Sequence, residues 1–194
     1  MNSVPSDEKQ WIEWFAVQRK AVALSLENKL SAAVSEVNAF IQNDLINDVL
    51  RNAIGFRGDL WEELGDLEAA KSDFMAAHRL SEQCDFERYT LELSLGGIAT
   101  RLRLRGDAIL WYFRALETAA GDPTISGATA LGKFLRVRMA EPFSEIEMRL
   151  ISKVILQAWT LFGIEGDPDL TDLEAVVEIL KREQRKSKRD RPTS

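Results

Sequence analysis

The stretch of sequence that decides the fold runs from Gly58 to His78 and reads G-D-L-W-E-E-L-G-D-L-E-A-A-K-S-D-F-M-A-A-H. Apolar residues recur at helical spacing on both sides of Gly65-Asp66, which predicts two helices joined by a tight turn. Gly58 and Ala70 are small enough for the two helices to approach closely. Larger residues and one further alanine are expected to fill the seam between them: Trp61, Leu64, Leu67, Phe74 and Ala77.

The same spacing occurs three times in the first part of the chain. Ala33, Ala70 and Ala108 stand 37 and 38 residues apart. A larger apolar residue follows each by four positions, and a small residue precedes each by twelve. These are Val37, Phe74 and Tyr112, and Ala21, Gly58 and Gly96. A period of this length is typical of stacked repeats, in which no unit buries its apolar face alone.

The order of residues in 58–78 resembles a tetratricopeptide repeat, and the resemblance extends over roughly residues 8–120. Asn28 replaces the turn glycine in the first copy and Arg103 in the third, whose Gly106 comes three residues later. The resemblance implies an all-α fold, a right-handed array of antiparallel helical hairpins. Such an α-solenoid would contain about three to four units and a C-terminal capping helix. A generic helical bundle with coincidental spacing is the alternative.

The apolar periodicity and the proline positions predict nine helices. Ser144 and Thr171 each begin an S/T-x-x-E capping box. The segment 101–105, R-L-R-L-R, is interpreted as helix because helical pattern flanks it. The predicted helices cover residues 7–27, 29–43, 46–64, 66–81, 86–105, 107–120, 124–139, 144–163 and 171–187. A fourth, degenerate unit over 124–163 and a terminal cap from Thr171 complete the expected array.

Length and composition predict a single domain over residues 1–181, since 194 residues of which 45% are hydrophobic can bury one core. Residues 182–194 are expected to form a basic, disordered tail. Residues 181–191 hold seven Lys or Arg against two acids, a net charge of +5, whereas the whole chain carries −6. The tail could bind an acidic partner, but it lacks an aromatic residue for base stacking. We therefore expect a solvated helix end and no nucleic-acid partner.

Targeting features favour a cytoplasmic protein. Cys84 is the only cysteine, so no internal disulfide is possible. The N-terminus lacks the charged-then-apolar organisation of a signal peptide. No apolar stretch approaches the ~20 residues that a membrane-spanning helix needs, so no membrane association is expected.

The sequence contains little material for catalysis. His78 is the only histidine, which leaves little material for a histidine-based metal site or for a Ser-His or Cys-His nucleophile system. There is no phosphate-binding G-x-x-x-x-G-K-[ST] loop and no G-x-G-x-x-G after a strand. We expect no enzymatic activity, no cofactor and no metal.

The resemblance implies a role in protein–protein recognition, with the first helix of each pair lining a concave groove for a peptide or helix of a partner. Ten residues would face that groove: Asn52, Asp59, Glu62, Glu63, Thr90, Leu93, Arg101, Thr129, Lys133 and Arg136. Such a protein would act as an adaptor, regulator or chaperone. The alternative is a small acidic immunity or inhibitor protein that neutralises a toxin by covering its active site, because the chain outside residues 181–191 carries −11.

The first predicted helix carries an aromatic cluster. Trp11, Trp14 and Phe15 are expected to share one face. They would pack onto the helix over 29–43, or they would form a homodimer or partner contact, since exposed aromatic patches mark interfaces.

Overall fold

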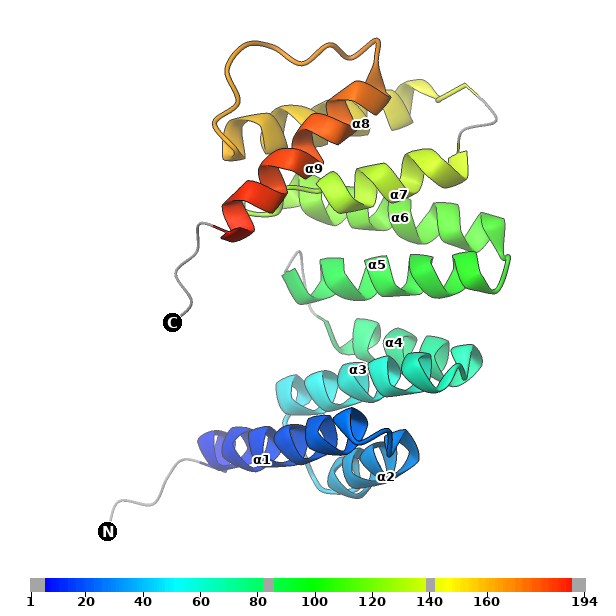
Figure 1. Ribbon diagram of the computed structural model, residues 1–194, viewed down its shortest axis with the longest axis vertical. Helices are drawn as coiled ribbons and strands as arrows, with labels where there is room; N and C mark the ends of the chain where they lie inside the picture. The colour runs from blue at the N-terminus through cyan, green and yellow to red at the C-terminus, as the bar shows by residue number, and fades with distance from the viewer. Residues whose placement is uncertain (1–5, 82–85, 139–141, 190–194) are drawn as a thin grey trace. The chain divides into compact units, whose positions relative to one another are not determined.

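The computed structural model describes residues 6–81, 86–138 and 142–189, which form nine α-helices and no strand (Figure 1). The helices are α1 (Ser6–Leu26), α2 (Leu30–Ile41), α3 (Asn47–Leu64), α4 (Leu67–Leu80), α5 (Phe86–Arg101), α6 (Arg105–Gly121), α7 (Ala128–Arg138), α8 (Glu145–Leu161) and α9 (Leu173–Arg189). The predicted all-α class is confirmed for the part of the chain that the structure describes.

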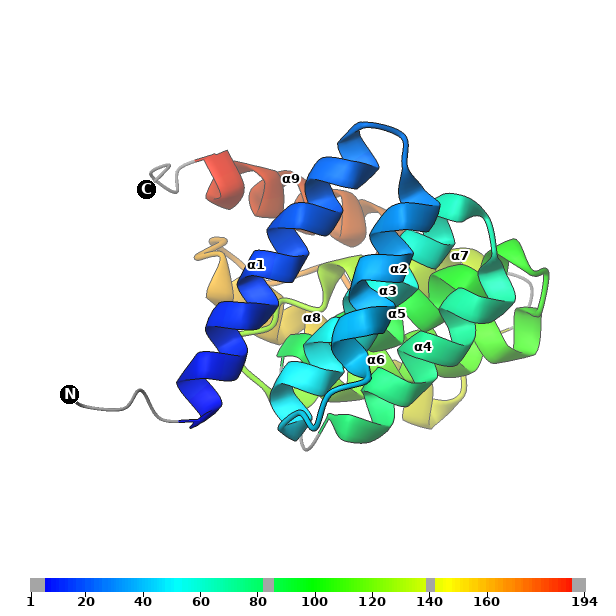
Figure 2. The same cartoon turned by 90° about the horizontal axis from the view of Figure 1, so that it is seen from below.

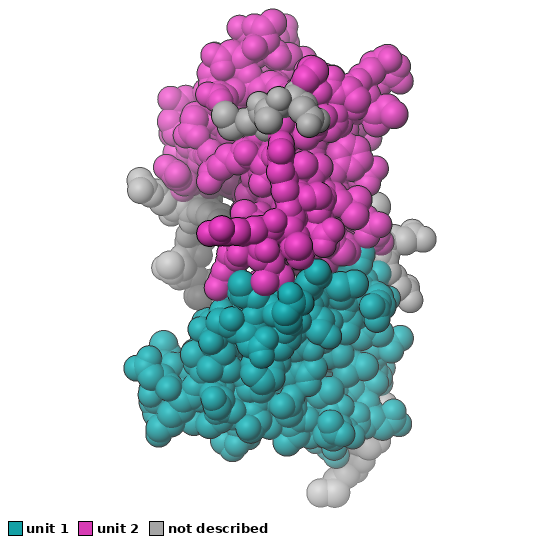
Figure 3. Space-filling view, turned by 90° about the vertical axis from the view of Figure 1, so that its right-hand side faces the viewer, with its two compact units in different colours: residues 1–82 teal, residues 83–194 magenta. Residues whose placement is uncertain are grey.

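Helix packing divides the chain into two compact units, residues 1–82 and 83–194 (Figure 3). Unit 1 contains α1–α4 and unit 2 contains α5–α9. The sequence predicted one domain over 1–181. That single domain stays a prediction. The buried apolar residues form one cluster around Trp14 and Val37 in unit 1 and another around Leu131 and Phe134 in unit 2. Helices joined by short turns pack mainly on their neighbours in sequence, which allows a core to divide in this way.

Three turns between helices share one conformation, at the spacing of the sequence repeat. Asn28, Gly65 and Arg103 have left-handed φ values of 59°, 84° and 60°. In each turn the amide of the following residue donates to the carbonyl five positions earlier, which satisfies a carbonyl at the helix end. These bonds run from Lys29 to Leu24 at 2.8 Å, from Asp66 to Trp61 at 3.0 Å and from Leu104 to Ala99 at 2.8 Å.

The third turn corrects the interpretation of 101–105 as helix. Helix α5 ends at Arg101, and Arg103 occupies the left-handed position that Gly65 takes one repeat earlier. A left-handed conformation is unfavourable for a residue with a Cβ atom, so the local sequence around Arg103 does not by itself predict the turn.

A glycine opposite an aromatic ring brings the helices together in both α3–α4 and α5–α6. A Cβ atom on Gly58 would lie 2.7 Å from Phe74 Cε1, and one on Gly96 would lie 2.5 Å from Tyr112 Cδ1. Glycine is therefore needed at both positions for this close packing. The sequence predicted that Gly58 would let α3 and α4 approach closely and that Phe74 would fill their seam, and in the structure Phe74 lies against Gly58. The three repeating alanines, Ala33, Ala70 and Ala108, are all fully buried.

Trp14 lies in the core of unit 1, which corrects the prediction of one shared aromatic face. Its side chain is 2% exposed and packs on Phe40 of α2 and Phe56 of α3, with ring centroids 5.5 and 5.8 Å away. Phe15 is 51% exposed, and Trp11 stacks on it at 5.7 Å. Consecutive residues point about 100° apart on a helix, so Trp14 faces α2 and Phe15 does not. Helices α1 and α2 lie side by side in unit 1 (Figure 2).

Both units bury charged groups that hydrogen-bond across helices. In unit 1, Arg57 donates through two nitrogens to the carboxylate of Asp73, with both distances 2.6 Å, and through a third to Asn38 Oδ1 at 2.6 Å. In unit 2, Glu92 is 1% exposed and accepts a hydrogen bond from Thr118 Oγ1 at 2.7 Å. These bonds offset the desolvation of the buried carboxylates.

Helix α7 begins four residues later than predicted, because the preceding segment forms a turn. Asp122 Oδ1 accepts hydrogen bonds from the amide and hydroxyl of Thr124, at 2.8 and 2.7 Å. Gly127 then takes a left-handed φ of 63°, and the helix starts at Ala128.

The predicted capping box at Ser144 is confirmed at the start of α8. At α9 the prediction is wrong, since the amide of Ala175 donates to Asp172 at 3.0 Å and the helix starts after Asp172. Thr171 bonds to Asp169 instead. Helix α9 continues to Arg189, so residues 182–189 of the predicted disordered tail are helical, and residues 190–194 lie outside the described ranges.

Candidate functional site

The ten residues predicted to face a groove lie on three helices in two units. Helix α3 of unit 1 carries Asn52, Asp59, Glu62 and Glu63, while in unit 2 helix α5 carries Thr90, Leu93 and Arg101 and helix α7 carries Thr129, Lys133 and Arg136. All of the unit 2 residues except Arg101 line one or both of two cavities. A continuous groove that runs from acidic to basic residues stays a prediction.

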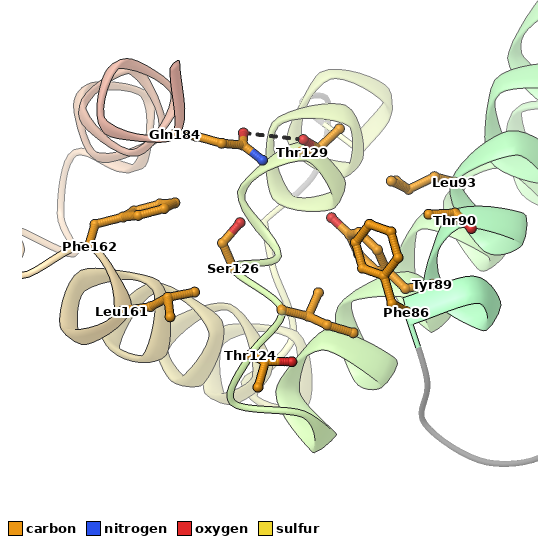
Figure 4. Close-up of a pocket in the computed structure, with 11 residues that line it drawn as sticks. Phe86, Tyr89, Thr90, Leu93, Thr124, Ser126, Thr129, Leu161, Phe162 and Gln184 are labelled. Atoms are coloured by element: carbon orange, nitrogen blue, oxygen red, sulfur yellow. Dashed lines mark hydrogen bonds between the residues drawn. The ribbon is translucent and has the colours of Figure 1, made fainter. Parts of the chain in front are cut away.

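A cavity of about 390 Å³ opens in unit 2 between the start of α5, the loop before α7 and the end of α8 (Figure 4). Its lining contains polar as well as apolar side chains, and we term it the apolar cavity after the large apolar side chains on its two sides. Phe86 and Tyr89 line one side, and Leu161 and Phe162 line the opposite side. Phe86 is 63% exposed and Leu161 is 44% exposed, so the rim of this cavity presents apolar surface to solvent. The volume lies within the range of ligand-binding pockets.

Tyr89 forms a fixed part of this wall. Its hydroxyl hydrogen-bonds with the backbone amide of Ala130 and the side chain of Thr129 in the first turn of α7, where backbone amides have no partner within the helix. Burial raises the pKa of Tyr89 to about 12, against the smaller opposing effect of these two bonds. The ring therefore stays neutral and anchors α5 to α7.

A second cavity, which we term the cationic cleft, has a volume of about 520 Å³ and lies between α7 and α9. Lys133 and Arg136 on α7 and Lys181 and Arg185 on α9 line it, together with a single carboxylate, Glu178. Lys181 Nζ donates to Glu178 Oε1 at 2.6 Å. That hydrogen bond is the main reason that the pKa of Glu178 is lowered. Four cations against one anion leave a net charge of +3, which favours anionic ligands.

Gly132 allows α9 to approach α7 and so helps to shape the cationic cleft. A Cβ atom at this position would lie 3.1 Å from Lys181 Cε and 3.3 Å from Val177 Cγ1. Helix α9 crosses α7 in Figure 1 and buries Val177 and Leu180 in the core of unit 2. Burial of these residues holds Lys181 and Arg185 beside the cleft.

The apolar cavity and the cationic cleft adjoin each other. Thr129 and Gln184 line both, and Thr129 Oγ1 lies 3.5 Å from Gln184 Oε1 in a hydrogen bond (Figure 4). An apolar group and an anionic group of one ligand can thus be held at the same time, the first by desolvation and the second by charge.

Unit 1 carries an acidic cluster, Asp59, Glu62 and Glu63, in the last two turns of α3. Carboxylates are unfavourable at the C-terminal end of a helix because the backbone dipole is negative there. Desolvation, followed by repulsion from Glu62 and Glu63, raises the pKa of Asp59 to about 6. Ser25 of α1 donates to Glu63 at 3.0 Å. Charges kept together against electrostatic repulsion are typical of functional surfaces.

Sequence reasoning missed the contributions of α8 and α9 to the unit 2 site. Lys181 and Arg185 were assigned to the end of the domain and to a solvated tail. Their spacing of four residues, with Glu178 one turn earlier, places all three on one helix face, and this signal was available in the sequence. Phe86 and Leu161 lie at helix ends, where apolar periodicity does not distinguish a cavity wall from the core.

Two other kinds of feature are absent from the described residues. No group of three or more His, Cys, Asp or Glu side chains is placed to hold a metal ion. None of the helices in these ranges combines the length and apolar character that crossing a bilayer requires.

Comparison with known proteins informs the fold. No protein-family model matches the chain, and the comparison with curated proteins found no match either. Among solved structures, the chain is similar to the crystal structure of BtubC (BKLC) from P. vanneervenii, with 16% sequence identity and a TM-score of 0.52. The similarity covers 92% of this chain and 82% of that chain. At this identity the likeness concerns the fold alone, which is helical in both proteins.

Proposed function

We propose that this chain is a protein-interaction module of tetratricopeptide-like helical hairpins, which binds a peptide or helix of a partner protein. Three equivalent turns at Asn28, Gly65 and Arg103 support a repeated hairpin unit. The glycine–aromatic contacts in α3–α4 and α5–α6 support it as well. The likeness of the whole chain to BtubC is consistent with this architecture.

The binding surface that we propose is formed by α5, α7, α8 and α9 of unit 2. The observation that carries the proposal is the apolar cavity adjoining a cleft with four cationic side chains. A partner segment with one bulky apolar side chain next to several Asp or Glu residues fits both. The apolar side chain would supply affinity through desolvation, and the carboxylates would set orientation and speed association.

The experiment measures binding of a fluorescein-labelled peptide in which one phenylalanine is flanked by aspartates, by fluorescence anisotropy against the full chain. Leu161→Asp should weaken binding by removing apolar surface, and Arg136→Glu combined with Arg185→Glu should weaken it by reversing charge. We expect a loss of about tenfold or more from each change. Lys153→Glu, on an exposed part of α8, is the control for one charge reversal away from the site and should leave the affinity unchanged.

Two results would count against this site. One is equal binding by the charge-reversed variant and the Lys153→Glu control. The other is equal binding of the peptide and a version in which alanine replaces phenylalanine, since the cavity would then have no role.

A second candidate function is inhibition of a basic target by the acidic cluster on α3. The raised pKa of Asp59 favours it, because a basic partner would relieve the repulsion among the three carboxylates. Reversal of Glu62 and Glu63 to lysine distinguishes the two functions. If the protein is an inhibitor, the Glu62 and Glu63 reversal should abolish binding to the natural partner. If it is a peptide-binding module, Arg136→Glu combined with Arg185→Glu should abolish that binding.

A further inference from the structure

Helix α1 has a second apolar face, in addition to the face that buries Trp14 and Ala21 in unit 1. Six apolar side chains on this second face are exposed to solvent: Ile12, Phe15, Ala16, Val22, Ala23 and Leu26. The four larger ones are between 42% and 81% exposed. Scattered exposed apolar residues are ordinary, but a row of them along one helix, interrupted only by Arg19, is typical of an interface.

The spacing of the stripe fits a helix as its occupant. Ile12, Phe15, Arg19, Val22 and Leu26 follow each other at steps of three, four, three and four residues, which is the a/d pattern of a coiled coil. Ala16 and Ala23 directly follow Phe15 and Val22, which occupy the d positions. The small alanine side chains leave room for a second helix to approach closely. The stripe spans about 21 Å along α1, at 1.5 Å per residue.

We propose that α1 pairs in antiparallel orientation with α1 of a second copy of this chain. In one register the central part of the stripe pairs with itself, with Ile12 opposite Val22 of the second copy and Phe15 opposite Arg19 of the second copy. Leu26 then lies opposite Glu8, beyond the end of the apolar seam. In that register each a position faces a d position, and Ala16 lies close to its own counterpart. The guanidinium of Arg19 then rests on an aromatic ring, a favourable cation–π arrangement.

Arg19 also decides the orientation of the pair. A parallel pair would place Arg19 directly opposite Arg19 of the second copy in the apolar seam, which like-charge repulsion disfavours. The antiparallel register separates the two arginines. The seam is short and falls below the roughly 800 Å² per partner of a stable complex. The dimer is therefore weak, with a Kd in the micromolar range.

Sedimentation equilibrium on the full chain, from about 5 to 500 μM, tests this pairing. Ile12→Lys and Val22→Glu should each weaken self-association by about tenfold or more, because each buries an unpaired charge in the seam. Both substitutions together in one chain should restore it, since each introduced lysine then faces an introduced glutamate. Glu13→Gln changes the charge by the same single unit as Ile12→Lys, off the stripe, and should leave self-association unchanged. Both stripe residues are exposed, and circular dichroism verifies the folding of every variant.

Three results would overturn the proposal. A wild-type chain that stays monomeric over the whole range shows that a second copy is not the occupant, and that another protein's helix would have to be sought. Self-association that neither single substitution affects places the contact elsewhere. Self-association that the single substitutions weaken and the double substitution fails to restore excludes the antiparallel register.

Discussion

Gly96 and Gly97 are neighbours on α5 that should respond in opposite ways to the same substitution. A Cβ atom on Gly96 would lie 2.5 Å from Tyr112 Cδ1, inside the seam with α6. A Cβ atom on Gly97 would meet only the flexible end of Lys133, whose Nζ lies 4.0 Å away. Each glycine is therefore a matched control for the other, since helix, chemistry and change in volume are the same.

The magnitudes follow from two opposing effects. Alanine is favoured over glycine inside a helix by about 1 kcal/mol, and both variants receive this gain. Gly97→Ala should accordingly raise the free energy of unfolding by up to about 1 kcal/mol. Gly96→Ala must also displace an aromatic ring or separate α5 from α6, and overpacking of this kind costs about 1–3 kcal/mol. The free energies of unfolding of the two variants should therefore differ by about 1–3 kcal/mol.

Urea unfolding followed by far-ultraviolet circular dichroism measures this difference. A double-mutant cycle with Tyr112→Leu isolates the contact, because a smaller side chain should remove most of the penalty of Gly96→Ala while leaving Gly97→Ala unaffected. Equal free energies of unfolding for the two alanine variants would refute the packing of α5 on α6 described above. So would a Gly96→Ala penalty that persists in full in the Tyr112→Leu background.

Two further predictions concern pH. The hydrogen bonds from Arg138 are the largest influence that lowers the pKa of Glu147 to about 2, and the side chains of both residues are 14% exposed. Because the pKa of Glu147 is lower in the folded state than in the unfolded state, the stabilisation is complete above about pH 4.5 and disappears as the pH falls toward 2. Glu147→Gln should therefore lower the free energy of unfolding at pH 7 by about 1–3 kcal/mol, and by progressively less at lower pH, as measured by urea titration. For Asp59 the sign is opposite, since its raised pKa of about 6 means that the charged form destabilises the folded state. Asp59→Asn should therefore raise the melting temperature at pH 8 and change it little at pH 4, and a gain of the same size at both values would contradict the role of charge.

The contacts that could be predicted from sequence are those between residues close in the chain. Gly96 and Tyr112 are sixteen residues apart, and the same separation joins Gly58 to Phe74, so the sequence repeat places an equivalent pair in both copies. Arg103 illustrates the limit of this approach. Its position 38 residues after Gly65 indicated a turn, but its residue type and flanking pattern indicated helix, and the repeat spacing was the better guide.

The unit 2 site depends on contacts that the repeat does not encode. The apolar cavity brings together Phe86 and Phe162, which are 76 residues apart, and the cationic cleft joins Lys133 to Arg185. Their proximity depends on where α9 lies on α7, and a close approach at Gly132 permits that placement. Sequence reasoning located half of the cleft, on α7, and assigned the other half to a tail.

The sequence by itself determined the helices, two of the seams between them and the left-handed turns at Asn28 and Gly65, because these follow from periodicity, small residues and the conformational freedom of single positions. Tertiary structure decided which side of an ambiguous helix is buried. Trp14 and Phe15 are adjacent, large and aromatic, yet one is 2% exposed and the other 51%. Helix α1 is apolar on two sides, so only its packing against α2 and α3 selects the core face, and the remaining stripe is left exposed.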